Sequence, residues 1–97
     1  MLQITVKFGE PLRRVIGQRR VSFYLSEDAT VADLLALLAQ QYAGFETAFR
    51  GDDLGRPYPY ILFINGRPVT AANYGATHLQ EQDIVHLVLP VVGGGHA

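Results

Sequence analysis

One amphipathic helix constrains the fold of this chain more than any other feature. Apolar residues recur at helical spacing between Ser26 and Gly44 and form one stripe, made of Val31, Leu34, Leu35, Leu38 and Tyr42. Thr30 is placed to cap the first turn, Asp33 follows in a variant of the capping box, and Gly44 is expected to end the helix. A lone helix must bury such a stripe, and a sheet is the only partner that this sequence offers.

Two alternating segments precede the helix and predict strands. Apolar and polar residues alternate over residues 2–8 and again over residues 20–25, which is the period of a half-buried strand. The segment between them, residues 10–20, holds a proline, a glycine and four arginines and is expected to be a connection. The two segments therefore predict an antiparallel hairpin with a long loop.

The second half of the chain predicts three further strands. Residues 45–57 are expected to form a loop, anchored by the two phenylalanines at positions 45 and 49. A strand then leads into the two-residue turn Asn65-Gly66. The return strand, 67–69, is expected to be short, because its proline has no N–H to donate to a neighbouring strand. After an irregular stretch, residues 84–90 form the final strand.

This order of elements predicts an α+β chain with the β-grasp fold, a mixed sheet of about five strands around one main helix. The last strand is expected to lie beside the first. Residues 1–90 would make up the domain and residues 91–97 a flexible glycine-containing tail. A chain of 97 residues is long enough for one hydrophobic core but not for two.

Composition excludes several classes of protein. The chain has no cysteine, which excludes a disulfide scaffold, a cysteine nucleophile and cysteine-ligated metal sites. A net charge of −1 gives no reason to expect nucleic acid or an anionic membrane as partner. No apolar run reaches the length of a membrane span, and the first residues lack the pattern of a signal peptide, so a cytoplasmic location is expected. The three histidines lack the spacing of metal ligands, and no metal site is predicted.

Three segments resemble the MoaD/ThiS family of sulfur carriers, and more distantly ubiquitin. The first is the segment with Leu12, Arg13 and Gly17 after the first strand, and the second is the strand-turn-strand around Asn65-Gly66. The third is the chain end, where an aspartate precedes an alternating strand, a proline, two valines and two glycines. Diglycine alone is a weak signal, whereas diglycine just after a closing β-grasp strand is a strong one.

The resemblance implies a carrier that is a substrate and not an enzyme. A ubiquitin-activating-like adenylating partner would use ATP to activate the carboxylate at the diglycine, Gly93 and Gly94, and the chain itself would bind no cofactor. A thiocarboxylate formed there would supply sulfur to a synthase, and molybdopterin is the preferred product. Because Gly95, His96 and Ala97 follow the diglycine, these three residues are expected to be removed by a protease.

The last strand offers a candidate partner surface. Ile84, His86 and Val88 share one face, opposite Val85, Leu87 and Leu89, so one set should be core and the other an exposed apolar stripe or a surface buried under a loop. By resemblance, Arg13 is a further candidate contact, as are three tail residues, Pro90, Val91 and Val92.

Two other functions remain open from the sequence. The chain would act as a protein modifier if the same glycine were conjugated to lysines of target proteins. It would act as a β-grasp binding module if the residues beyond the diglycine were retained and the tail had no chemistry. The sequence does not identify the acceptor, the targets or the oligomeric state.

Overall fold

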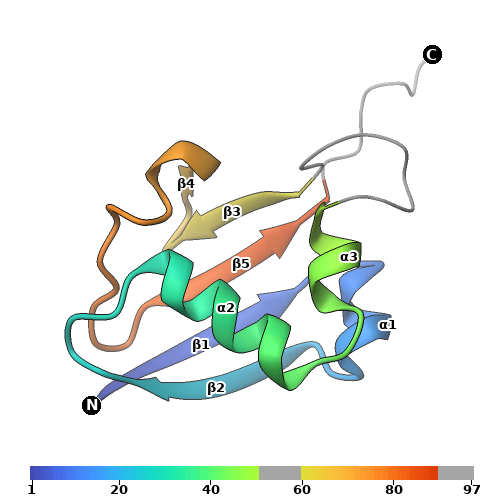
Figure 1. Cartoon of the computed structure of the whole chain (residues 1–97), viewed down its shortest axis with the longest axis horizontal. Helices are drawn as coiled ribbons and strands as arrows, with labels where there is room; N and C mark the ends of the chain where they lie inside the picture. Colours follow the sequence, from blue (N-terminus) through green and yellow to red (C-terminus); the bar gives the residue numbers. More distant parts are fainter. Residues whose placement is uncertain (51–59, 90–97) are drawn as a thin grey trace.

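The computed structural model describes residues 1–50 and 60–89, which form five strands and three α-helices around one core (Figure 1). In chain order, the elements are β1 (Leu2–Phe8), α1 (Leu12–Ile16), β2 (Arg20–Leu25), α2 (Val31–Gln41), α3 (Phe45–Arg50), β3 (Ile61–Ile64), β4 (Arg67–Val69), the 3₁₀ helix Ala71–Asn73, and β5 (Ile84–Val88). None of the helices in this described part is long and apolar enough to cross a membrane.

The sheet has the mixed topology that the order of elements predicts. Its strand order is β2-β1-β5-β3-β4. The predicted hairpin β1–β2 is antiparallel, and β5 lies beside β1 in parallel, as expected for the first and last strands. The other neighbour of β5 is antiparallel β3, so the last strand occupies the centre of the sheet. These pairings confirm the β-grasp fold.

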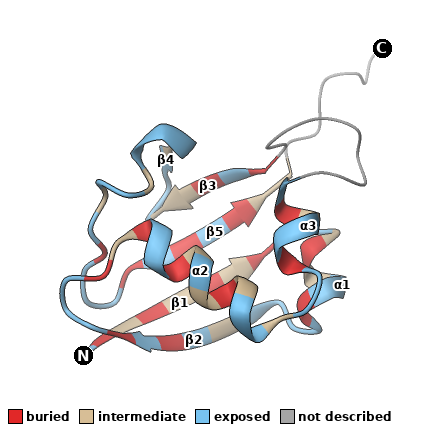
Figure 2. Cartoon of the chain, viewed as in Figure 1, coloured by how far each residue is buried: buried red, intermediate tan, exposed pale blue. Residues whose placement is uncertain are grey.

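The helices cover one face of the sheet, and the core lies between the two layers (Figure 2). From α2 this core contains Val31, Leu34 and Leu38, while Leu35 and Tyr42 of the predicted stripe are only partly buried and pack against it. The strands contribute their inward residues, which include Leu2, Ile4, Val6, Phe8, Phe23, Leu25, Leu62, Val85 and Leu87. One helix stripe and one sheet face therefore bury each other.

The capping box of α2 is confirmed, although it uses Asp in place of the more common Glu. The Asp33 backbone N–H donates to Thr30 Oγ1 at 3.2 Å, and the Thr30 N–H donates to Asp33 Oδ2 at 2.9 Å. The predicted end of this helix is corrected. It ends at Gln41 with Tyr42 as its cap, and Gly44, with φ of +86°, instead leads into α3.

Two segments expected to be loops contain short helices. The connection after β1 includes α1, which buries Leu12 and Ile16, and the segment after Gly44 begins with α3, which buries Phe45 and Phe49. The two phenylalanines are the anchors that the sequence predicts, with rings stacked 5.5 Å apart. Tertiary burial stabilises these helices, since pieces of five and six residues would be marginal on their own.

The stretch between β4 and β5 was expected to be irregular, and most of it is. It contains the single 3₁₀ turn Ala71–Asn73, and it is tied to the start of α2 by backbone hydrogen bonds from Val31 to Thr77 and from Ala32 to Tyr74. Leu79 is buried and Tyr74 is partly buried against the core, so this segment packs on the core at both residues.

Candidate functional site

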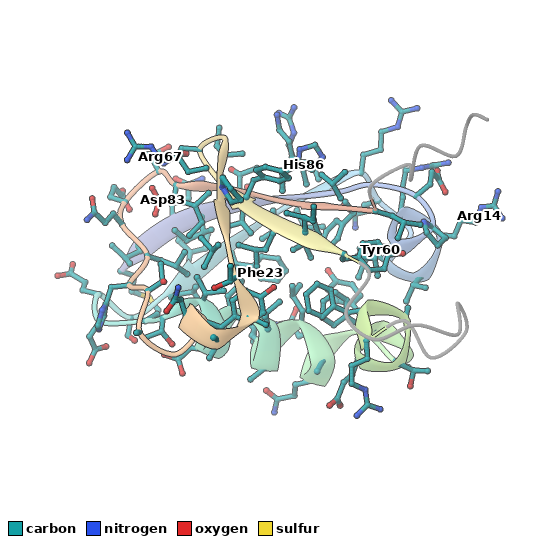
Figure 3. The ribbon with its side chains drawn as sticks, turned by 90° about the horizontal axis from the view of Figure 1, so that it is seen from above. Arg14, Phe23, Tyr60, Arg67, Asp83 and His86 are labelled. Atoms are coloured by element: carbon teal, nitrogen blue, oxygen red, sulfur yellow. The ribbon has the colours of Figure 1, made fainter. Side chains whose placement is uncertain are left out.

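Successive side chains of strand β5 alternate between the buried core and the exposed face of the sheet. Val85 and Leu87 are fully buried, whereas Ile84 is 40 % exposed, His86 is exposed and Val88 is partly exposed. His86 projects from the side of the sheet opposite the helices, and Phe23 projects into the core (Figure 3). The expectation that Ile84, His86 and Val88 share the uncovered face is confirmed, and burial under a loop of the described chain is excluded.

Neighbouring strands extend this uncovered surface. In the sheet register His86 lies between Lys7 of β1 and Phe63 of β3, and Val88 lies opposite Ile61 of β3. Lys7, Phe63, His86 and Val88 line an open groove of about 450 Å³ that also reaches Ile84 and the Asn65-Gly66 turn. We call the surface formed by Ile61, Phe63, Ile84, His86 and Val88 the outer face. It is an exposed apolar patch with a polar centre, which is typical of a docking surface.

The Asn65-Gly66 turn fixes one end of the outer face. Both residues have positive φ, 51° and 86°, as a two-residue hairpin turn of this type requires. The Asn65 side chain donates to Asp83 Oδ1 at 2.8 Å and accepts from the Ile84 backbone N–H at 2.9 Å. Asp83 is largely buried and also accepts from the Gln80 backbone N–H at 2.8 Å. The turn is therefore fastened to the start of β5 by side chains.

A basic groove lies at the C-terminal end of β1, where the chain turns toward α1. Its volume is about 370 Å³, and its lining includes Lys7, Arg13, Arg19, Arg20 and His86. Lys7 and Arg20 are opposite one another in the β1–β2 register, and neither forms an ion pair within the described residues. Like charges directly opposite on two strands repel, so this groove favours an anionic partner group.

Arg13 was predicted to contact a partner, and the structure places it in this groove. Its Nε donates to Glu10 Oε2, and the same carboxylate receives Arg14 Nε at 3.4 Å. The side chains of Arg13 and Glu10 are 41 % and 49 % exposed, so water screens this pair and it contributes little to stability. Arg13 stays accessible beside Lys7, next to the outer face.

The tail follows directly from this site. β5 ends at Val88, and the Gly9 N–H donates to the Leu87 carbonyl at 2.9 Å, so the end of β5 is joined to the connection that leads to α1. The remaining predicted site residues are Pro90, Val91, Val92, Gly93, Gly94, Gly95, His96 and Ala97, and all of them lie outside the described residues.

Comparisons with known proteins identify the family of this chain. The sequence model of the ThiS family matches residues 6–95, which is most of the chain. The chain belongs to the ThiS family. The match includes both strands that frame the outer face and continues through the glycines at positions 93 and 94.

Relatives of this ThiS-family chain carry names of small modifiers. It is 32% identical over 93 residues to small archaeal modifier protein 3 from Haloferax volcanii, a match that covers 96% of this chain and all of the relative. The crystal structure of SAMP1 from Haloferax volcanii superposes with a TM-score of 0.75 at 30% identity, covering 95% of this chain and 99% of that one.

A more distant neighbour shares the fold. A putative molybdopterin converting factor subunit 1 from Pyrococcus furiosus gives a TM-score of 0.70 at 21% identity, with 94% of this chain and all of that chain covered. These relatives are small modifiers or a converting-factor subunit by name, and none is named as an enzyme that acts alone.

The sequence analysis did not identify four residues of the outer face and the basic groove, Lys7, Arg20, Ile61 and Phe63. Lys7 and Arg20 lie on strands whose alternation was recognised, whereas Ile61 and Phe63 lie on β3, a continuous apolar run in which alternation does not show the outward positions. The neighbours of β5 depend on strand order and register, so the positions opposite His86 could not be deduced from the sequence.

Proposed function

We propose that this chain is a carrier whose C-terminal glycine carboxylate, at Gly94, is activated by a partner enzyme at the expense of ATP. The observation that supports this most strongly is the continuity of the outer face with the root of the tail. Ile84, His86 and Val88 lie along β5, and the tail, residues 91–97, begins three residues after Val88. A partner bound to the outer face therefore holds the origin of the tail.

The reach of the tail sets where the chemistry takes place. Gly94 is five positions beyond Leu89, and at about 3.4 Å per extended residue the reacting carboxylate can reach up to about 17 Å from Leu89. In this proposal the extended tail carries the reacting atoms away from the described residues and into the partner. The partner must supply the nucleotide site and any catalytic side chain, and this chain supplies docking and a slender substrate.

The residue types of the tail suit entry into a narrow active site. The glycines at positions 93 and 94 present no side chains to its walls. Val91 and Val92 favour an extended backbone, and Pro90 removes a donor that would help the tail fold back.

The proposed reaction has two steps. An oxygen of the Gly94 carboxylate attacks the α-phosphorus of ATP and displaces pyrophosphate, which gives an acyl adenylate. A sulfur nucleophile carried by a partner then attacks the carbonyl carbon and displaces AMP. If that nucleophile is a thiol, the product is a thioester. If it is a persulfide, the product is an acyl disulfide, and a second partner thiol then attacks the donor's sulfur, forms a disulfide with it and releases the thiocarboxylate at Gly94.

Residues beyond the diglycine must be removed before the first step. Gly95, His96 and Ala97 would move the terminal carboxylate by up to about 10 Å, while productive alignment tolerates errors of about 1 Å. The proposal therefore includes a processing protease that cleaves after Gly94.

We further propose a sulfur acceptor in cofactor synthesis, with a molybdopterin-forming synthase preferred. The proline and two valines before the glycines, together with the fold shared with a putative molybdopterin converting factor, support this choice. A second candidate is attachment to target proteins, in which a lysine amine displaces AMP or a thiol and forms an amide. The name of the relative that is 32% identical, small archaeal modifier protein 3, supports that candidate.

The decisive experiment is ATP–pyrophosphate exchange on the cognate adenylating enzyme. A chain that ends at Gly94 should support exchange, and the chain that ends at Ala97 should not. A third chain that ends at Gly93 is the matched control and should also be inactive. Equal exchange with all three chains, or none with any, would contradict the proposal.

Product analysis then separates the two acceptors. Incubating the activated chain with a sulfur donor should exchange one carboxylate oxygen for sulfur, visible by intact mass. Amide-linked adducts on partner lysines, with no thiocarboxylate formed, would favour the modifier.

A further inference from the structure

The two edges of the sheet differ in how far they are protected from further pairing. β4 has only three residues, one of them Pro68. Ile64 and Arg67 flank the two-residue turn and form a hydrogen-bonded pair, so the next residue, Pro68, directs its backbone away from β3. The donor that would face a new strand is missing at that position, because proline has no N–H.

β2, at the opposite edge, contains no proline, so every outward-facing residue has both a backbone N–H and a C=O. Phe8 N donates to the Arg19 carbonyl at 2.9 Å, which places the next non-hydrogen-bonded pairs of the β1–β2 ladder at Arg20, Ser22 and Tyr24. The backbone N–H and C=O of these three residues therefore point away from β1. No backbone bond outside the β1–β2 ladder reaches them from residues 1–50 or 60–89, and their side chains are exposed.

We propose that two copies of this chain pair through β2, antiparallel, about a twofold axis beside Ser22. In this register Ser22 lies opposite Ser22 of the second copy, and Arg20 lies opposite Tyr24 of the second copy. The three outward residues are spaced symmetrically about Ser22, so every outward donor meets an acceptor. The pairing forms about six inter-strand hydrogen bonds and leaves no outward group of β2 unpaired.

Side chains favour the same register. Arg20 faces Lys7 across the β1–β2 ladder and is repelled by it. In the dimer Arg20 gains the ring of Tyr24, which is 62% exposed in the single chain, and a guanidinium over a tyrosine ring is attractive. The two Arg20 side chains stay about 13 Å apart along the strands, beyond the screening length in physiological salt.

This dimer goes beyond the proposed function and does not rest on it. A twofold axis perpendicular to the sheet places both outer faces on the same side. β5 is separated from the β2 edge by β1, so the pairing covers neither the outer face nor the root of either tail. Two activation surfaces would therefore be presented side by side.

Site-specific crosslinking tests the register, since the chain has no cysteine of its own. In a Ser22→Cys variant the two Cα atoms across the axis would lie about 5.5 Å apart, within disulfide range. In the matched Arg20→Cys variant they would be about 13 Å apart and out of range. We expect Ser22→Cys to form covalent dimer at least ten times faster than Arg20→Cys, and a mixture of Arg20→Cys with Tyr24→Cys to form the heterodimer.

Sedimentation equilibrium up to about 1 mM, the Kd range of weak interfaces, measures the association itself. Ser22→Pro removes an outward N–H without breaking a β1–β2 bond and should raise the dimer Kd at least tenfold. Ser22→Thr keeps that N–H and should leave the Kd unchanged. If Ser22→Pro unfolds by circular dichroism, the crosslinking rates decide. A wild-type chain that stays monomeric to 1 mM, or equal rates for the two cysteine variants, would overturn the dimer.

Discussion

The inner and outer faces of β5 belong to one strand but differ in burial. Val85 and Leu87 are fully buried against the helices, while Ile84 and His86 are left exposed on the opposite side. Burying large apolar side chains stabilises the fold by about 1.5–3 kcal/mol each, and the outer residues gain little of this. An apolar outer face at the centre of the sheet therefore adds little to stability, and we propose that it binds a partner.

The largest expected difference comes from placing the same charge on adjacent residues. Leu87→Asp puts an unpaired carboxylate in the core and should abolish cooperative unfolding, while His86→Asp should change stability by less than about 0.5 kcal/mol. Thermal and urea unfolding measure both. If Leu87→Asp is too unfolded to compare, Leu87→Ala should cost about 2–5 kcal/mol. Comparable losses at the two positions would show that the faces are assigned wrongly.

A charge on the outer face should affect binding and leave stability almost unchanged. Val88→Arg introduces a bulky cation into the groove beside His86 and should weaken binding to the adenylating partner at least tenfold, with unfolding midpoints nearly unchanged. Titration calorimetry with that enzyme measures the change. Arg67→Ala, at an exposed position on β4, is the matched control and should bind normally. Intact binding by Val88→Arg, with reduced stability, would reverse the comparison.

The Asn65 turn connects the two faces, because it fixes β3 to the start of β5. Asn65→Ala removes the hydrogen bonds to Asp83 and Ile84 and puts alanine, which adopts positive φ less readily than asparagine, at φ of 51°, so it should cost about 2 kcal/mol. Asn65→Gly loses the same hydrogen bonds but tolerates the φ angle, and its cost should be smaller. Urea unfolding distinguishes the two. Equal costs would show that backbone conformation contributes nothing at this turn.

Tyr60 is the polar exception within the core and should give the smallest effect. Its ring stacks on Phe49, and its hydroxyl is buried without a hydrogen-bond partner among the described residues. Burial raises the pKa of Tyr60, and the nearby Leu12 backbone, which falls short of a hydrogen bond to the hydroxyl, offsets this only partly.

A raised pKa favours the neutral hydroxyl in the folded state. The stability that this confers is present below the ordinary tyrosine pKa and is lost as pH rises through the raised value. Tyr60→Phe should therefore leave stability at pH 7 within about 0.5 kcal/mol and reduce the alkaline decline. A Tyr60→Phe chain that loses stability at neutral pH would reveal a partner for the hydroxyl. Tyr24→Phe, at an exposed position, is the control.

Much of this architecture could be predicted from alternation and turn chemistry. The alternation of β5 placed Val85 and Leu87 on one face and Ile84, His86 and Val88 on the other, and Asn65-Gly66 located the hairpin. The short helices α1 and α3 could not be predicted, because their stability depends on burying Leu12 and Phe45 against distant residues. The basic groove was missed for a related reason. Lys7 and Arg20 are thirteen positions apart in the chain, and only the strand register places them together.

The most direct test of the central claim is the intact mass of this protein purified from its native host. If the tail carries the chemistry, the chain should end at Gly94 or carry an adduct at that residue, with Gly95, His96 and Ala97 absent. Replacing Gly94 with Ala should block formation of any adduct and leave the fold unchanged. A host population consisting only of chains that end at Ala97, with no modification, would contradict the account.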